Sequence, residues 1–150
     1  MQLNGSRLIA ADRAVVWAFL NDPDILRACI PGCEELSGSP QEGFAAVVKQ
    51  KIGPVQATFR GAVTLSDIKA PESYTITGEG KGGVAGFAKG SAQVALAERE
   101  GGTALTYTVD AQVGGKIAQL GGRLIDSFAR KLSDQFFERF QTEVESRIAA

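Results

Sequence analysis

Histidine is absent from this chain of 150 residues, and cysteine occurs only as Cys29 and Cys33. Without histidine the chain lacks the commonest general base and the commonest metal ligand of proteins. A C-x3-C pair with no further thiol or imidazole cannot complete a four-ligand zinc site. A disulfide is not expected in a cytosolic chain. We therefore interpret both cysteines as small apolar residues that flank a turn.

Strong net charge and long apolar runs are also missing. A formal net charge of -1 gives no electrostatic reason to expect nucleic acid binding or a strong attraction to anionic lipid. No stretch approaches the roughly 18 apolar residues of a transmembrane helix, so we expect no integral membrane segment. Residues 1–5 lack the basic and apolar pattern of a signal peptide. The sequence favours a cytoplasmic protein that forms a single domain over residues 1–150.

Glycine, in contrast, is abundant, with 18 residues in 150, against an average of roughly 7%. The segment 56–66 alternates polar residues with Ala57, Phe59, Gly61, Val63 and Leu65, which predicts a half-buried strand. Residues 78–92 also follow a strand pattern, but glycine and alanine fill it. A sheet with such small side chains on its inner face, covered by a helix, leaves room for a ligand.

The order of predicted elements indicates an α+β fold. A strand near 3–9 precedes two short helices, the first with Asp12 at its N-cap and the second with Pro23 in its first turn. Six strands follow near 33–38, 43–52, 55–68, 73–81, 87–98 and 103–114, joined by connections short enough for hairpins. Apolar residues then recur every four positions from Leu120 to Val144. This pattern predicts one long helix gripped by a curved, seven-stranded antiparallel sheet.

This order, together with four segments, resembles the START-like superfamily, also called Bet v 1-like or SRPBCC. Within it the chain resembles the CoxG family, which is named for a subunit of carbon monoxide dehydrogenase. The segments are Val16 to Pro23, Cys29-Ile30-Pro31-Gly32-Cys33, Ile52-Gly53-Pro54-Val55 through Leu65, and Gly86-Phe87-Ala88-Lys89-Gly90-Ser91-Ala92-Gln93-Val94. The first is shared across the superfamily and indicates the fold, whereas the last two are more particular to the CoxG group.

The resemblance implies a helix-grip fold and a non-enzymatic accessory protein of molybdenum-containing CO dehydrogenases and related hydroxylases. Such proteins are associated with attaching the enzyme to the membrane and with a quinone-like apolar electron acceptor. We therefore expect a quinone or similar apolar molecule as ligand, no covalent cofactor, and hydroxylase subunits as partners. Many members carry a C-terminal membrane anchor, but this chain ends at Ala150 after its long helix. We expect membrane association, if any, to be peripheral and through partners.

The inward phase of each predicted strand, with the facing helix, supplies the candidate ligand-binding residues. Most are apolar or small, and the polar groups among them are the amide of Gln50 and the hydroxyls of Tyr74 and Tyr107. Arg7 interrupts the apolar phase of the first strand and is expected at the cavity rim. Such a set suits an apolar ligand held by one or two hydrogen bonds. The candidates are Phe44, Val48, Gln50, Phe59, Gly61, Val63, Tyr74, Ile76, Gly78, Gly90, Ala92, Tyr107, Leu120, Leu124 and Phe128.

Other functions stay open at this point. The chain could be an assembly factor with no ligand, or a cyclase, dehydratase or hydrolase of the kinds found elsewhere in the superfamily, although its inward acids and bases are few. The glycines at 78–83 do not form a phosphate loop, because a strand and not a helix follows them. Phe136, Phe137 and Phe140 form either helix core or a partner surface, including that of a homodimer.

Overall fold

The computed structural model describes residues 1–149, and within them the strands and helices follow the predicted order. The strands are β1 (Gln2–Ile9), β2 (Cys33–Ser39), β3 (Gly43–Ile52), β4 (Val55–Lys69), β5 (Ser73–Lys81), β6 (Phe87–Arg99) and β7 (Gly102–Gly114). The α-helices are α1 (Arg13–Leu20), α2 (Pro23–Cys29) and α3 (Gly122–Ala149), and two short 3-10 helices are η1 (Gly83–Ala85) and η2 (Lys116–Leu120).

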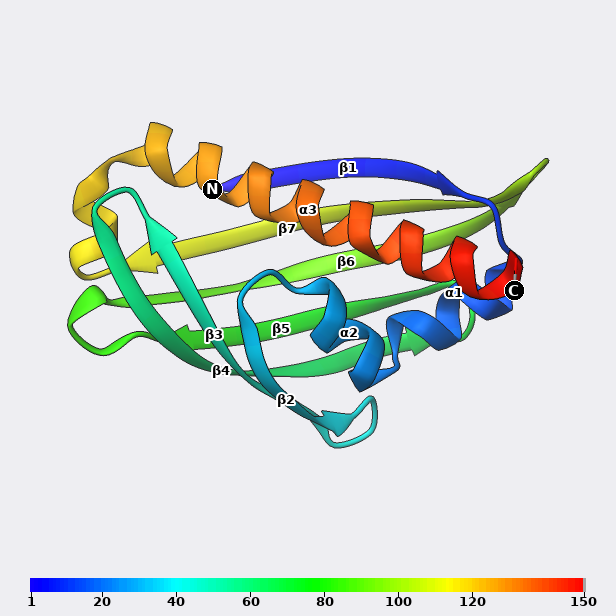
Figure 1. Ribbon diagram of the computed structural model, residues 1–150, viewed down its shortest axis with the longest axis horizontal. Coiled ribbons are helices and arrows are strands. Elements are labelled where there is room, and N and C mark those ends of the chain that lie inside the picture. The colour runs from blue at the N-terminus through cyan, green and yellow to red at the C-terminus, as the bar shows by residue number, and fades with distance from the viewer. Residues whose placement is uncertain (150) are drawn as a thin grey trace.

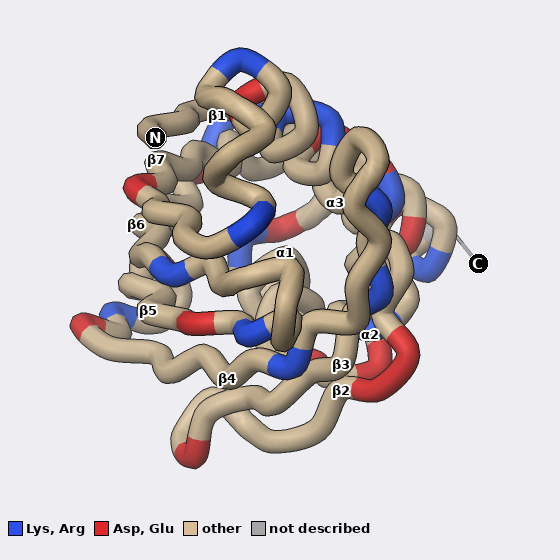
Figure 2. The backbone as a smooth tube through the Cα atoms, turned by 90° about the vertical axis from the view of Figure 1, so that its left-hand side faces the viewer, with Lys and Arg blue, Asp and Glu red and all other residues tan. Residues whose placement is uncertain are grey.

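The described strands form one antiparallel sheet in the order β1-β7-β6-β5-β4-β3-β2. Successive strands from β2 to β7 are hairpin neighbours, and β1 returns beside β7 (Figure 1). The sheet bends from β1 round to β2, and α3 lies across its open side (Figure 2). This arrangement confirms the predicted helix-grip fold.

Local sequence signals explain several element boundaries. Asp22 caps α2, because its Oδ1 accepts hydrogen bonds from the backbone N–H of Asp24 at 2.9 Å and of Ile25 at 3.5 Å. Asp12 occupies the predicted N-cap position of α1, but its side chain makes no capping bond. Gly53, with a φ of 58°, allows the tight turn that joins β3 to β4.

The long helix begins later than the apolar repeat indicates. Leu120 lies in η2, and α3 starts at Gly122 after Gly121, which has a φ of 92°. A residue in that backbone region cannot continue a helix, so the chain turns there before α3 begins. The four-residue repeat of apolar side chains runs through this break and therefore hides it.

The described core falls into two separate clusters. The larger cluster joins α1, α2 and the second half of α3 to the sheet, and includes Val16, Ile25, Leu105, Phe140 and Val144. The smaller cluster lies where the β3–β4 turn, η1 and η2 meet, an end of the molecule that we call the tip. Its buried members are Ile52, Val55, Ala85 and Ile117. The sheet and α3 continue between the two clusters, and this middle region is where side chains become small.

Candidate functional site

A cavity of about 600 Å³ lies in this middle region, between the inner face of the sheet and α3. Strands β3 to β7, the two short helices and α3 all contribute to its wall. Ten of the predicted candidates line it: Phe44, Val48, Phe59, Gly61, Val63, Tyr74, Ile76, Gly78, Gly90 and Ala92. The structure therefore brings most of the predicted set together around one space.

Small side chains create the space. Ala46, Ala88 and Ala111 join the glycines and Ala92 along the wall. Ala62, Glu79, Lys89 and Ser91 also border the cavity, although their strand phase places them on the outer, exposed face. They reach it because their neighbours Gly61, Gly78, Gly80 and Gly90 have no side chain. Part of the wall is therefore bare strand backbone.

The glycines of the wall differ in their surroundings. A Cβ added at Gly80 would find its nearest atom, the Cβ of Phe59, at 4.0 Å, so this glycine faces open space. A Cβ added at Gly61 would stand 2.8 Å from the backbone oxygen of Glu79. At Gly90 it would collide with the backbone oxygen of Asp110 and lie 2.8 Å from the Cα of Ala111. Gly61 and Gly90 are thus needed for close strand approach, independently of any ligand.

Tyr74 supplies an inward-facing polar group to the lining. Its side chain is buried, and burial raises the pKa of its hydroxyl well above the usual value. The hydroxyl therefore stays protonated at neutral pH and can donate a hydrogen bond. The ring of Trp17 meets that of Tyr74 edge-on, with centroids 5.1 Å apart. Because Trp17 is the single tryptophan of the chain, its fluorescence reports directly on a residue of the cavity wall.

The part of α3 that faces the cavity differs from the predicted one. Leu132, Phe136 and Phe137 line it, one to several turns beyond the predicted Leu120, Leu124 and Phe128. Leu120 and Phe128 pack against the core cluster at the tip. Leu124 lies over the β3–β4 turn, where its Cδ2 would stand 2.9 Å from a Cβ on Gly53. The early turns of α3 close the tip, and the middle turns cover the cavity.

Two predicted polar candidates also lie outside the lining. The side-chain amide of Gln50 donates to the backbone oxygen of Pro31 at 2.7 Å and so holds the α2–β2 connection against β3. Tyr107 stacks on Phe137 instead of pointing its hydroxyl into the cavity. Arg7, expected at the rim, donates to the Oε1 of Gln141 at 3.2 Å and to the backbone oxygen of Asp134 at 3.4 Å. Arg7 therefore joins β1 to α3 by polar contacts.

Sequence reasoning missed four apolar residues of the lining: Leu20, Leu26, Ile30 and Leu36. Leu26 and Ile30 form the apolar side of α2 and its C-cap, a pattern that indicates burial but not the neighbour. The register of β2 against β3 places Leu36 opposite Ala46, which is itself part of the wall. The signal for these residues was apolar phase alone, and only the fold shows what they face.

The cysteines take no part in the cavity wall. Cys29 is buried in the larger core cluster, and Cys33 begins β2 with its Sγ 3.3 Å from the backbone oxygen of Glu35. Both thiols are free. Burial, with a smaller contribution from the Glu143 carboxylate, raises the pKa of Cys29 to about 11. Among residues 1–149, no group of three or more acidic or cysteine side chains could hold a metal ion.

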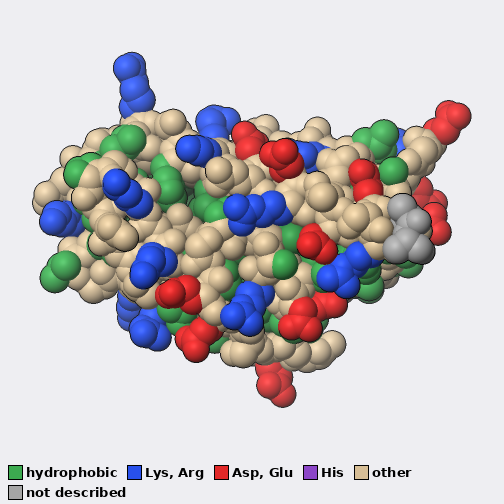
Figure 3. Space-filling model, viewed as in Figure 1, with side chains coloured by type: hydrophobic (Ala, Val, Ile, Leu, Met, Phe, Trp, Pro, Cys, Tyr) green, Lys and Arg blue, Asp and Glu red, His purple; other side chains and the backbone are tan. Residues whose placement is uncertain are grey.

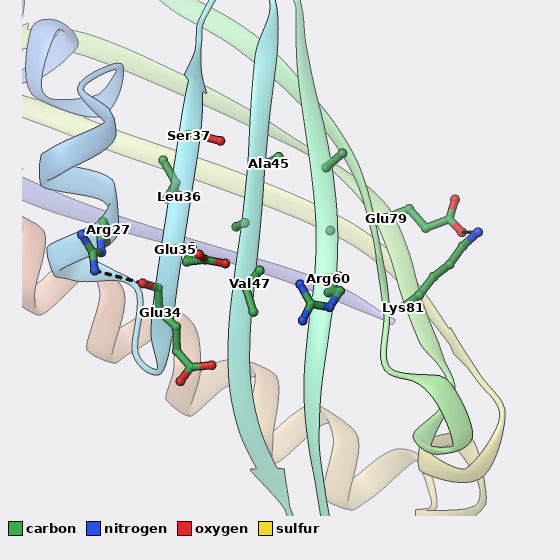
Figure 4. A pocket seen from close by; sticks show the side chains of 13 residues that line it. Arg27, Glu34, Glu35, Leu36, Ser37, Ala45, Val47, Arg60, Glu79 and Lys81 are labelled. Atoms are coloured by element: carbon green, nitrogen blue, oxygen red, sulfur yellow. Dashed lines mark hydrogen bonds and ion pairs between the residues drawn. The ribbon is translucent and has the colours of Figure 1, made fainter.

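A second depression, of about 880 Å³, lies on the outer face of β2 to β5 (Figure 4). Its walls are charged and exposed, and Arg27, Glu35, Arg60, Glu79 and Lys81 surround small floor residues such as Ala45. Arg27 donates to the backbone oxygen of Glu34 at 2.9 Å, and Lys81 pairs with Glu79 at 3.8 Å. This mixed, solvated surface does not have the apolar lining of a small-molecule site. The inner cavity is the stronger candidate.

None of the helices in the described part of the chain is long and apolar enough to cross a membrane. The longest, α3, carries charged residues such as Arg130, Lys131 and Glu138 on the side that faces solvent.

Comparison with solved structures places several bacterial proteins near this one. A conserved protein from Geobacillus kaustophilus shares 33% identity and superposes with a TM-score of 0.90, over 97% of this chain and 96% of that one. A protein from Rhizobium leguminosarum shares 17% identity with a TM-score of 0.72, over 97% and 95% of the two chains. The protein CV1439 from Chromobacterium violaceum shares 14% identity with a TM-score of 0.70, over 96% of each chain. The latter two show a common fold only.

Among proteins with curated descriptions, none matches this chain. Residues 5–145, however, match the sequence profile of a family described as the carbon monoxide dehydrogenase subunit CoxG. The match covers every strand and helix that forms the cavity wall. The chain is therefore a member of the CoxG family of carbon monoxide dehydrogenase subunits.

Proposed function

We propose that this protein is a non-enzymatic accessory protein of a molybdenum hydroxylase of the CO dehydrogenase type. In this proposal its cavity binds a flat apolar molecule, a quinone, without covalent attachment. The protein brings the enzyme and its electron acceptor together at the membrane electron-transport chain. The observation that carries the proposal is the apolar cavity itself, in a chain whose family is named for a subunit of CO dehydrogenase.

The size and lining of the cavity support an apolar ligand. Its volume of about 600 Å³ falls within the range of roughly 300–1,000 Å³ that is usual for small-molecule sites. Aromatic side chains from both sides, including Phe44, Phe59 and Phe136, are available to contact a planar ring. A quinone ring presents two carbonyl oxygens and apolar faces, so it needs few hydrogen-bond donors and a mostly apolar wall.

The scarcity of inward polar groups also bears on the type of chemistry. Tyr74 is a hydrogen-bond donor of the right kind for a quinone carbonyl, whereas the charged side chains of Glu79 and Lys89 belong to the outer phase. General acid–base catalysis requires ionisable groups placed beside the reacting atoms. The lining is better suited to holding a ligand than to transforming it, and a subunit that carries an electron acceptor needs only to hold it.

Titration with short-chain menaquinone and ubiquinone analogues tests the ligand part of the proposal. We expect saturable one-to-one binding by calorimetry, accompanied by a change in Trp17 fluorescence because Trp17 contacts Tyr74 in the wall. Purified molybdenum hydroxylase, titrated separately, tests the partner part. Hydroxylase binding with no quinone binding would instead support a ligand-free assembly factor. Turnover of a small apolar substrate would support the enzyme alternative.

A further inference from the structure

The charged side chains are segregated along the long axis of the molecule. Basic residues gather over the tip in Figure 3, and acidic residues become more frequent toward the opposite end. The exposed bases of the tip are Lys51, Lys81, Lys116 and Arg123, each next to one of its turns. The opposite end carries Asp67, Glu72, Glu98 and Glu100 in its own turns. A net charge of -1 for the whole chain conceals this separation.

Acidic residues do not cancel the charge of the tip. Glu79 is paired with Lys81 at 3.8 Å, and Asp126 lies in the first turns of α3. Lys49 and Lys89 extend the basic surface along the outer faces of β3 and β6. The tip therefore presents an excess of positive charge to any surface that approaches along the long axis.

Exposed apolar side chains lie among these bases. Val84 has 93% of its surface exposed, and Leu124 and Phe87 are exposed by 37% and 36%. Val84 stands at the apex of η1, between Gly83 and the buried Ala85, which belongs to the core cluster of the tip. Because Ala85 is held in the core, Val84 projects from a fixed turn. A fully exposed aliphatic side chain in the middle of a basic surface is a feature of interaction sites.

The chemistry of the tip favours a lipid surface over a protein. Lysine is depleted from protein–protein interfaces, yet it supplies most of the charge here. Lysine near an anionic bilayer gains electrostatic attraction, and apolar side chains of the same surface can enter the boundary between headgroups and acyl chains. A convex end with a single protruding valine has the shape for shallow contact with a planar surface.

We propose that the tip docks on an anionic lipid bilayer, with Val84 entering the headgroup region and Lys51, Lys116 and Arg123 facing lipid phosphates. This inference deepens the membrane part of the proposed function and rests on it for its biological purpose. Docking of this kind places the domain on the membrane through its own surface and adds to any attachment through partners. Its test requires neither quinone nor hydroxylase, so the two proposals can fail separately.

Sedimentation with vesicles measures this docking. We expect the protein to bind vesicles of phosphatidylglycerol and phosphatidylcholine in equal parts, but not vesicles of pure phosphatidylcholine. Binding should weaken as salt increases, because the Debye length falls to about 10 Å at 0.1 M. Absence of binding to the anionic vesicles at low salt would overturn the proposal.

Charge-matched variants locate the contact. The pair Lys51→Glu and Lys116→Glu should lower the partition coefficient by about tenfold or more. The control pair Lys69→Glu and Arg99→Glu makes the same change in net charge at the opposite end and should lower it much less. Equal losses in the two pairs would show that net charge alone acts. Loss of hydroxylase binding in the tip pair, with no vesicle binding by the unmodified protein, would identify the tip as a protein interface.

The apolar contribution has its own pair of variants. Val84→Asp should reduce vesicle binding several-fold, whereas Ile68→Asp, at an exposed position of β4 near the opposite end, should leave it unchanged. Val84→Trp should strengthen binding, because tryptophan favours the membrane interface. Circular dichroism checks that each variant is folded. Unchanged binding in both Val84 variants would contradict the proposed insertion.

Discussion

Tyr107 stacks on Phe137, with ring centroids 4.4 Å apart and planes inclined by 16°. The hydroxyl of Tyr107 reaches the backbone of Gly5 on β1, where an added Cβ would stand only 2.5 Å from it. Phe137 in turn lines the cavity, so Tyr107 supports the wall from behind. Tyr74 is part of the wall itself. The two tyrosines of the chain therefore have different roles, one in packing and one at the proposed site.

This difference predicts opposite results for two matching substitutions. Tyr74→Phe removes the proposed donor to a quinone carbonyl and should weaken quinone binding by about 3- to 10-fold, the effect of one hydrogen bond. Tyr107→Phe should leave the affinity unchanged, because its hydroxyl is directed away from the cavity. Calorimetric titration of both variants measures the contrast. Equal affinities for the two variants would remove Tyr74 from the proposed site.

Ala92→Val tests whether the middle of β6 faces usable space. The cavity should accommodate the added methyl groups, so the free energy of unfolding should change by no more than about 1 kcal/mol, while ligand affinity falls by about tenfold or more. Ala95→Val, on the exposed face of the same strand, is the matched control and should change neither quantity strongly. Urea unfolding and ligand titration provide the two readouts. A loss of about 2 kcal/mol with unchanged binding would mean that Ala92 is close-packed core.

Two glycines of the wall should respond differently to alanine. Gly80→Ala should stabilise the protein by about 0.5–1 kcal/mol, because its Cβ meets open space and glycine is unfavourable inside a strand. Gly90→Ala should destabilise by about 1–3 kcal/mol, because the backbone of β7 cannot yield as a flexible side chain would. Chemical unfolding of both variants gives the comparison. Equal behaviour would show that the two glycines have the same surroundings.

High pH should destabilise the protein through Cys29. The pKa of its thiol is about 11 in the folded protein and 9.0 in the reference state, so the unfolded chain ionises first as pH rises. Stability is therefore complete below about pH 9 and is lost between about pH 9 and 11, by about 1–2 kcal/mol. Burial also raises the pKa of Tyr74, which adds to the loss above pH 10.

Unfolding midpoints measured across this range check the effect. Cys29→Ala should flatten the part of the pH profile that begins near pH 9, even though its stability at neutral pH also changes. Tyr74→Phe should flatten only the later part. A wild-type profile that does not fall with rising pH would contradict the assigned burial of both groups.

The sequence predicted the fold closely because its turns are explicit. Gly53-Pro54 and Gly101-Gly102 mark hairpin ends, and the predicted strands 55–68 and 87–98 end within one residue of β4 and β6. The small residues of the inner face follow from strand alternation, so much of the cavity wall was also predictable. The resemblance to the family came from the same segments and is confirmed over residues 5–145.

Other features depend on distances that sequence patterns do not contain. The apolar stripe of the long helix is continuous, so it could not show that Leu124 covers the tip while Leu132 covers the cavity. Gly80 and Gly90 look alike in the sequence, but the register of β6 against β7 brings backbone close to only one of them. Overall composition likewise concealed the charge of the tip, because acidic residues at the opposite end balance it.

Native mass spectrometry of the protein purified without detergent tests the central claim most directly. The account predicts a one-to-one complex with an apolar molecule that organic solvent releases and whose mass matches a prenylated quinone. Protein stripped of that molecule should rebind a quinone analogue, with reduced occupancy in Ala92→Val. A protein that carries no small molecule and shows no saturable binding of either menaquinone or ubiquinone analogues would contradict the account.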